Sequence, residues 1–164
     1  MKEVTEQGAY LELASRCARA EHCQHDLLEK MRQWGMSEEA RARVMERLIR
    51  ERYVDDERYA RAFVKDKIRY NKWGRRKVEQ ALWAKHISDD IREQVLNEID
   101  DEEYLNVLRP LLKQKRRTTT GKTSYEQNTK LIRFALGRGF TMDIIHQCME
   151  TDGIEDTEFM DQDS

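Results

Sequence analysis

Two cysteines and two histidines near the start of the chain are the side chains best suited to metal chemistry. They are Cys17, His22, Cys23 and His25. Thiolate and imidazole groups are the usual ligands of zinc, but structural zinc sites commonly use a paired Cys-x-x-Cys knuckle. This cluster contains no such pair, and Cys17 falls on the apolar face of a predicted helix. We therefore expect a buried thiol with surface histidines, and no metal.

Enzyme signatures are weak elsewhere in the chain. The segment Thr119-Thr120-Gly121-Lys122-Thr123 resembles the end of a phosphate-binding loop, but such a loop needs a glycine at the position of Arg116 and a preceding β-strand. Asp55 and Asp56 could bind a metal ion, yet a place at the start of a helix explains both. No nucleophile lies beside a general base. The sequence thus predicts no catalytic residue, no cofactor and no enzymatic activity.

Anion binding is the chemistry that the basic residues could support. The net charge is only −2, with 30 basic and 32 acidic residues, but the two signs are segregated along the chain. Between positions 58 and 77 only Asp66 opposes the basic residues. The candidate binding residues here are Arg58, Arg61, Lys65, Arg69, Lys72, Arg75, Arg76 and Lys77. A second basic run consists of Lys113, Lys115, Arg116 and Arg117.

The first five of these cations share one face of a predicted helix. Projected at 100° per residue, Arg58, Arg61, Lys65, Arg69 and Lys72 fall within a sector of roughly 80°. We call this row, with its continuation to Lys77, the cationic ridge. A charged face is most often only a solvated surface, but surface helices normally mix both signs. The near absence of acids favours an anionic partner, either nucleic acid or an acidic protein groove. For Tyr70 and Trp73, which lie in this region, we expect packing rather than stacking on bases.

One pattern occurs three times along the chain. In each copy an apolar helix ends, a hydroxylated residue follows, and a second helix begins. The hydroxylated residues are Ser37, Ser88 and Thr141, which are 51 and 53 positions apart. A repeat of this length indicates one supersecondary unit used three times, as in arrays that bind along an extended partner. Gly35 is expected to end its helix in the left-handed conformation.

The apolar spacing predicts three helices in each repeat. They lie near 5–19, 24–34 and 37–52, then from Asp55-Asp56 to about Tyr70, near 75–85 and 88–98, and finally near 101–117, 124–138 and 141–150. Pro110 is expected to kink or break the seventh of them. The predicted boundaries are 1–54, 55–99 and 100–150 for the repeats and 151–164 for an acidic disordered tail. The chain has one proline, and 38% of its residues are charged, which favours an all-α protein. An odd number of cysteines and no signal-like or membrane-spanning stretch favour the cytoplasm.

Three segments resemble motifs of the RecX family. Ala18-Arg19-Ala20-Glu21-His22-Cys23 is similar to the family's Ala-Arg-Arg-Glu-His-Ser, and Tyr53-Val54-Asp55-Asp56-Glu57-Arg58-Tyr59-Ala60 to its Tyr-Leu-Asp-Asp-x-Arg-Phe-Ala. Arg138-Gly139-Phe140-Thr141 resembles its Arg-Gly-Phe-Ser turn. The resemblance covers roughly residues 9–150. The chain departs from the family at Ala20, which lacks a cation, at Cys23, which is a weaker cap than Ser, and at His86, which replaces a turn Gly.

This resemblance implies a fold and a function. The fold is three tandem three-helix repeats in an elongated, curved array. The function is inhibition of the RecA recombinase by a monomer that lies in the groove of the RecA–DNA filament and limits filament extension, ATP hydrolysis and strand exchange. Its partners would be the RecA filament and single- or double-stranded DNA. Two alternatives stay open, a freestanding helical DNA-binding protein and a scaffold for another acidic protein.

Overall fold

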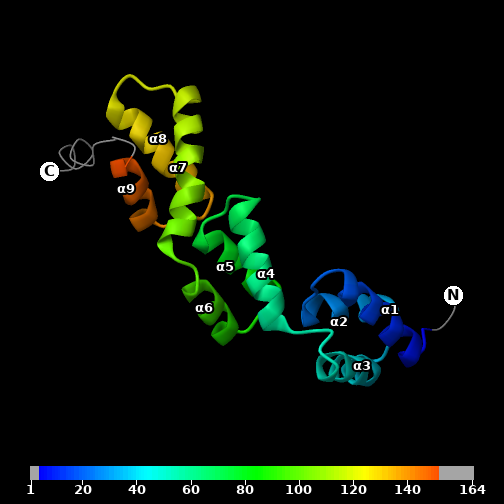
Figure 1. Ribbon diagram of the computed structural model, residues 1–164. Coiled ribbons are helices and arrows are strands. Elements are labelled where there is room, and N and C mark those ends of the chain that lie inside the picture. The colour runs from blue at the N-terminus through cyan, green and yellow to red at the C-terminus, as the bar shows by residue number, and fades with distance from the viewer. Residues whose placement is uncertain (1–3, 152–164) are drawn as a thin grey trace. The chain divides into compact units, whose positions relative to one another are not determined.

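The computed structural model describes residues 4–151, and every regular element in that range is an α-helix (Figure 1). The helices are α1 (Glu6–Arg19), α2 (Gln24–Gln33), α3 (Glu38–Arg50), α4 (Asp56–Arg69), α5 (Arg75–Ala84), α6 (Asp89–Asn97), α7 (Asp101–Thr118), α8 (Ser124–Gly137) and α9 (Met142–Thr151). The all-α prediction is confirmed. The predicted acidic tail lies outside the described residues, apart from Thr151 at the end of α9. None of the helices between residues 4 and 151 is both long enough and apolar enough to cross a membrane.

The chain forms two compact units. Among the described residues, the first comprises residues 4–63 and Leu82–Val95, and the second comprises Val64–Ala81 and residues 96–151. The division passes through α4, α5 and α6, the three helices of the predicted middle repeat. The boundaries of the three repeats at 1–54, 55–99 and 100–150 stay a prediction.

In the first unit, α1, α2 and α3 pack around an apolar core. The predicted faces are buried, with Leu13 on α1 and Leu48 on α3 fully inaccessible, and Met31 on α2 completes the contact. Cys17, which was predicted on an apolar helix face, and Ala40 are partly buried at the edge of this core. Burial of such side chains away from water is the main driving force for assembling three short helices.

In the second unit, α7 packs against both α8 and α9. The buried side chains of α7 recur at helical spacing. They are Tyr104, Leu105, Leu108 and Leu112. Phe140, in the turn between α8 and α9, is one of the largest fully buried side chains of the described residues.

The repeated hydroxylated residue caps a helix in each copy. The hydroxyl oxygens of Ser37, Ser88 and Thr141 accept backbone N–H groups at 3.1, 3.3 and 3.5 Å, three residues further on. Two positions before each cap, the backbone is left-handed: Gly35 has a φ of 82°, His86 of 59° and Gly139 of 95°. The same stop signal and start signal therefore mark the junction between the last two helices of every repeat.

Of the kink or break expected at Pro110, the break does not occur, because α7 continues through the proline as one helix; the kink stays a prediction. Proline removes the N–H that would bond the carbonyl oxygen of Asn106. Both Pro110 and Asn106 are exposed, so water can reach that oxygen. Leu108 and Leu112 on the opposite face are fully buried, and their packing holds the helix on both sides of the proline.

Candidate functional site

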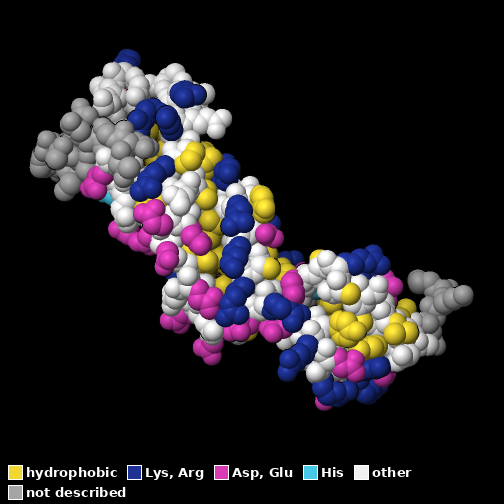
Figure 2. All heavy atoms as spheres, viewed as in Figure 1, with side chains coloured by type: hydrophobic (Ala, Val, Ile, Leu, Met, Phe, Trp, Pro, Cys, Tyr) yellow, Lys and Arg dark blue, Asp and Glu magenta, His cyan; other side chains and the backbone are white. Residues whose placement is uncertain are grey.

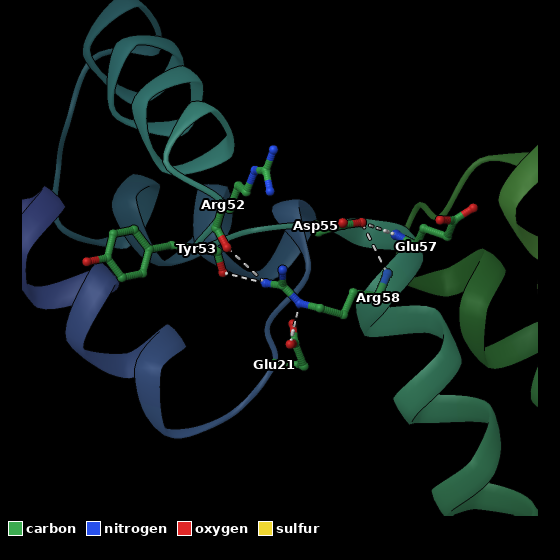
Figure 3. Close-up of polar contacts among 6 residues, drawn as sticks. All are labelled: Glu21, Arg52, Tyr53, Asp55, Glu57 and Arg58. Atoms are coloured by element: carbon green, nitrogen blue, oxygen red, sulfur yellow. Dashed lines mark hydrogen bonds and ion pairs between the residues drawn. The ribbon is translucent and has the colours of Figure 1, made fainter.

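The cationic ridge begins at the start of α4, where Asp55 caps the helix. Its carboxylate accepts the backbone N–H groups of Glu57 at 3.0 Å and Arg58 at 3.1 Å (Figure 3). Asp56 serves a different helix, because its carboxylate accepts the N–H of Gln24 at 2.9 Å in the first turn of α2. Burial raises the pKa of the Asp56 carboxyl above its ordinary value. The two adjacent acids thus have structural partners at two helix starts.

Arg58 is bound within the fold rather than free on the ridge. Its guanidinium pairs with Glu21 and also donates to the carbonyl oxygens of Arg52 and Tyr53, each at 3.2 Å (Figure 3). The hydrogen bond to Glu21 raises the pKa of Arg58, so the group stays charged. Arg61 likewise pairs with Glu57 at 3.2 Å. The first two cations of the ridge are therefore neutralised by carboxylates, which the pattern along α4 did not predict.

We expect Arg58→Ala to lower the free energy of unfolding by about 1 kcal/mol, since it removes a half-exposed ion pair and two bonds to carbonyl groups. Affinity for a single-stranded oligonucleotide should stay within twofold of that of the unmodified chain. Urea denaturation and fluorescence anisotropy would measure the two quantities. Arg58→Lys is the matched control, because it keeps the charge but not the forked geometry. Oligonucleotide binding that Ala abolishes and Lys preserves would contradict this structural role.

The Cys and His cluster near the start of the chain takes part in packing. Cys23 is fully buried, and burial raises the pKa of its thiol to about 11. The ring of His25 stacks on that of His86, with 3.9 Å between the ring centroids. Next to this pair, the ammonium of Lys85 lies 3.1 Å from both carboxylate oxygens of Asp26. These contacts join α2 to the end of α5 within the first unit.

The cations that belong to the second unit are freer. Lys65, Arg69, Lys72 and Arg76 are all exposed, and none of them has an ion pair among residues 4–151. Figure 2 shows Lys and Arg side chains in a row over α4. Lys72 follows α4 in the left-handed conformation with a φ of 58°, which turns the chain toward α5. This part of the ridge is suited to binding an anion, since none of these four cations is held in an ion pair within residues 4–151.

The aromatic residues of this region behave differently from one another. Trp73 is partly buried, and the ammonium groups of Lys67 and Lys77 lie 5.1 and 4.9 Å from its ring centroid. Cation–π contacts of this length hold the ammonium groups of Lys67 and Lys77 beside the Trp73 ring. Tyr70 is 72% exposed, so the prediction that it packs is wrong. Its position beyond the last buried residue of α4 leaves its ring in solvent.

Arg75 is held by the second unit itself. Its guanidinium donates to the backbone oxygen of Leu96 at 3.3 Å and to the side-chain oxygen of Asn97 at 2.9 Å. Arg75 is also partly buried. Of the two arginines that begin α5, only Arg76 therefore has a side chain that is both exposed and without a partner in the described residues.

Two turns are joined backbone to backbone beside these cations. The N–H of Gly74 donates to the carbonyl oxygen of Arg138 at 2.9 Å, and the N–H of Arg76 donates to that of Gly139 at 3.0 Å. The Arg138 side chain also reaches the carbonyl oxygen of Asn71 at 3.3 Å. We call this contact the turn junction. It brings Arg138, which the sequence analysis placed only in a turn motif, to the basic region.

The second basic run forms the last turns of α7. Lys113, Lys115 and Arg117 are exposed, and the Lys115 ammonium lies 5.2 Å from the centroid of the Phe134 ring. Arg116 differs, because it is partly buried and two of its guanidinium nitrogens are buried without a hydrogen-bond partner in the described residues. Basic side chains in the last turn also suit the negative end of the helix dipole.

Comparison with known proteins identifies relatives of this chain. Models of the second and third three-helix domains of RecX match residues 55–96 and 101–149. Regulatory protein RecX of Clostridium botulinum (strain Alaska E43) is 36% identical over 71% of this chain and 55% of the relative. That of Clostridium perfringens (strain 13) is 32% identical over 72% of this chain and 56% of the relative. The chain spans about half the length of such relatives.

Solved structures support the fold. The crystal structure of RecX from Lactobacillus salivarius matches with a TM-score of 0.79 at 19% identity, over 89% of this chain and 95% of that one. A second crystal structure, of regulatory protein RecX, has a TM-score of 0.80 at 17% identity, over 88% of this chain and 73% of that one. At this identity the likeness establishes the helical fold and does not assign binding residues.

Proposed function

The chain belongs to the RecX family, and from this premise we propose that it regulates the RecA recombinase. In this proposal a monomer binds in the groove of the RecA–DNA filament, in the cytoplasm. There it limits filament extension, ATP hydrolysis and strand exchange. It acts by occupying the filament and needs no catalytic residue of its own.

The observation that supports the proposal most directly is the set of unpaired cations in the second unit. They lie on α4, in the turn that follows it, at the start of α5 and at the end of α7. They are Lys65, Arg69, Lys72, Arg76, Lys113, Lys115 and Arg117. A filament that contains DNA offers phosphates to such side chains, and each neutralised phosphate releases counterions. Arg58, Arg61 and Arg75 have partners within the fold, so we expect them to contribute less to this binding.

We expect Arg76→Glu/Arg117→Glu to raise the concentration needed to inhibit RecA ATP hydrolysis at least tenfold. The reversal replaces two attractive contacts with repulsive ones on an exposed surface. ATP hydrolysis by RecA on single-stranded DNA measures the effect, and far-UV circular dichroism confirms that the helices are intact. Arg19→Glu/Arg50→Glu is the matched control, because it makes the same charge change at two exposed sites of the first unit. Equal loss of inhibition in both double variants would argue against this surface.

The same measurements separate the proposal from a freestanding DNA-binding protein. Binding to DNA alone through about five phosphates would give a log–log salt slope of about −4. Tight, sequence-selective binding without RecA, together with no effect on RecA ATP hydrolysis, would favour the freestanding DNA-binding protein. If the chain captures an acidic protein other than RecA, and if it neither binds DNA nor changes RecA ATP hydrolysis, the scaffold would be favoured.

A further inference from the structure

A groove between α4 and α7 has a composition that differs from the rest of the basic surface. It lies within the second unit and has a volume of about 350 Å³. Its lining residues are Lys65, Ile68, Arg69, Glu103, Asn106 and Val107. Cations, an acid, an amide and apolar side chains therefore meet in one small groove.

The arrangement of these side chains is that of a protein-binding site. Ile68 is only 3% exposed and Val107 is partly buried, so the floor is apolar. Lys65 and Arg69 lie one helical turn apart on α4, both exposed and without an ion pair among the described residues. An apolar centre with a charged rim is typical of interfaces between proteins.

The α7 side of the groove is poorly suited to binding a phosphate backbone. Glu103 lines the groove, and it follows Asp101 and Glu102 in the first turn of α7. A nucleic-acid strand carries a negative charge on every phosphate, so these acids repel each phosphate that passes along the α7 side of the groove. A peptide can instead place one carboxylate at Lys65 or Arg69 and turn the rest of its chain away. It can also supply the apolar side chain that the floor lacks.

We propose that this groove binds a short acidic segment of the partner protein. The segment's carboxylates face Lys65 and Arg69, and a neighbouring apolar side chain rests on Ile68 and Val107. Lys72, Arg76 and the basic side chains at the end of α7 bind the DNA phosphates. This assignment rests on the proposed function, and it divides one basic surface into a protein-binding part on α4 and a DNA-binding part beyond it.

Two binding assays test the assignment, one with RecA filaments on single-stranded DNA and one with the same DNA alone. Both are run at about 150 mM salt, where long-range charge effects are screened. Lys65→Glu/Arg69→Glu should weaken filament binding at least tenfold and change DNA binding less than threefold. The matched control Lys113→Glu/Lys115→Glu makes the same charge change on the same unit and should weaken binding in both assays.

Val107→Gln separates a peptide from a phosphate in the groove. The change removes the apolar contact with a peptide and adds no charge that would attract either ligand. We expect filament affinity to fall about fivefold while DNA affinity is unchanged. Position 107 is a partly exposed helix site where glutamine is a good helix former, and a thermal melt checks that the fold is retained.

Several results would overturn the proposal. Tighter or unchanged filament binding by Val107→Gln would exclude the apolar contact with a peptide, and equal losses in both assays for Lys65→Glu/Arg69→Glu would assign the groove to phosphate. A last outcome concerns the chain's own acidic segment as the ligand of the groove. If Glu158→Lys/Asp161→Lys raises filament affinity, and if adding Lys65→Glu/Arg69→Glu abolishes that rise, the groove belongs to this segment and not to the partner protein. If the unmodified chain binds DNA but no filament, the proposed function itself fails, which is a distinct outcome.

Discussion

Gly74→Ala should destabilise the second unit by at least about 3 kcal/mol, because the turn junction has no space for a side chain there. A Cβ atom at position 74 would collide with the backbones of Gly139 and Phe140. Neither backbone can move freely, since both turns are fixed by the two N–H to carbonyl bonds and Phe140 is fully buried. Urea denaturation followed by circular dichroism would measure the loss.

The chain supplies a control for this prediction. Gly137 lies at the end of α8, and a Cβ atom at this position would have open space around it, with no neighbouring atom within 4 Å. Gly137→Ala should therefore stabilise the protein slightly, by up to about 1 kcal/mol, since alanine is the better helix former. The turn junction also positions Lys72 and Arg76, so Gly74→Ala should lower DNA affinity even where the protein stays folded. A Gly74→Ala variant as stable as the unmodified chain would contradict this account.

Pro110→Ala, unlike Gly74→Ala, should stabilise the protein and raise the free energy of unfolding by about 1–3 kcal/mol. Proline inside a helix is disfavoured by about 3 kcal/mol relative to alanine. The substitution restores an N–H that can bond the carbonyl oxygen of Asn106, and the exposed position offers no steric obstacle. Thermal and urea denaturation would both detect the gain. Gln114→Ala, another exposed change on α7, should stay within about 0.5 kcal/mol.

A loss of stability in Pro110→Ala would mean that α7 depends on a local bend at this position. The Leu108 and Leu112 side chains would then no longer fit the core formed with α8 and α9. The experiment therefore distinguishes a helix that merely tolerates proline from one whose packing requires it.

The helices could be predicted from the sequence because their signals are local. Ser37, Ser88 and Thr141 each cap the helix that follows within three residues, and Gly35 ends its helix by its own backbone conformation. Such contacts join residues that are neighbours in the chain, so spacing and residue type are enough to predict them. The break at Pro110 was predicted wrongly because the packing of α7 on α8 and α9, which overrides the local preference, depends on distant parts of the chain.

The binding surface was less predictable, since it depends on contacts between distant residues. Arg58 is paired with Glu21, 37 positions earlier, and Arg75 with Asn97, 22 positions later. Arg138 lies 67 positions from Asn71, whose carbonyl oxygen it binds. A helical projection shows only the residues of one helix, and so it cannot distinguish a paired arginine from a free one. Tyr70 was misjudged for a related reason, because its exposure depends on where the neighbouring helices end.

The matched stop and start signals of the three repeats have a consequence for how such proteins evolve. Each repeat sets the junction between its own last two helices through a left-handed residue, where one helix ends, and a hydroxyl cap, where the next begins. Mutations on the solvent side of one copy therefore leave the architecture of the others untouched. After duplication, natural selection could enrich one copy in positive charge and leave its sisters mixed. A family built in this way can acquire a new ligand preference without inventing a new fold.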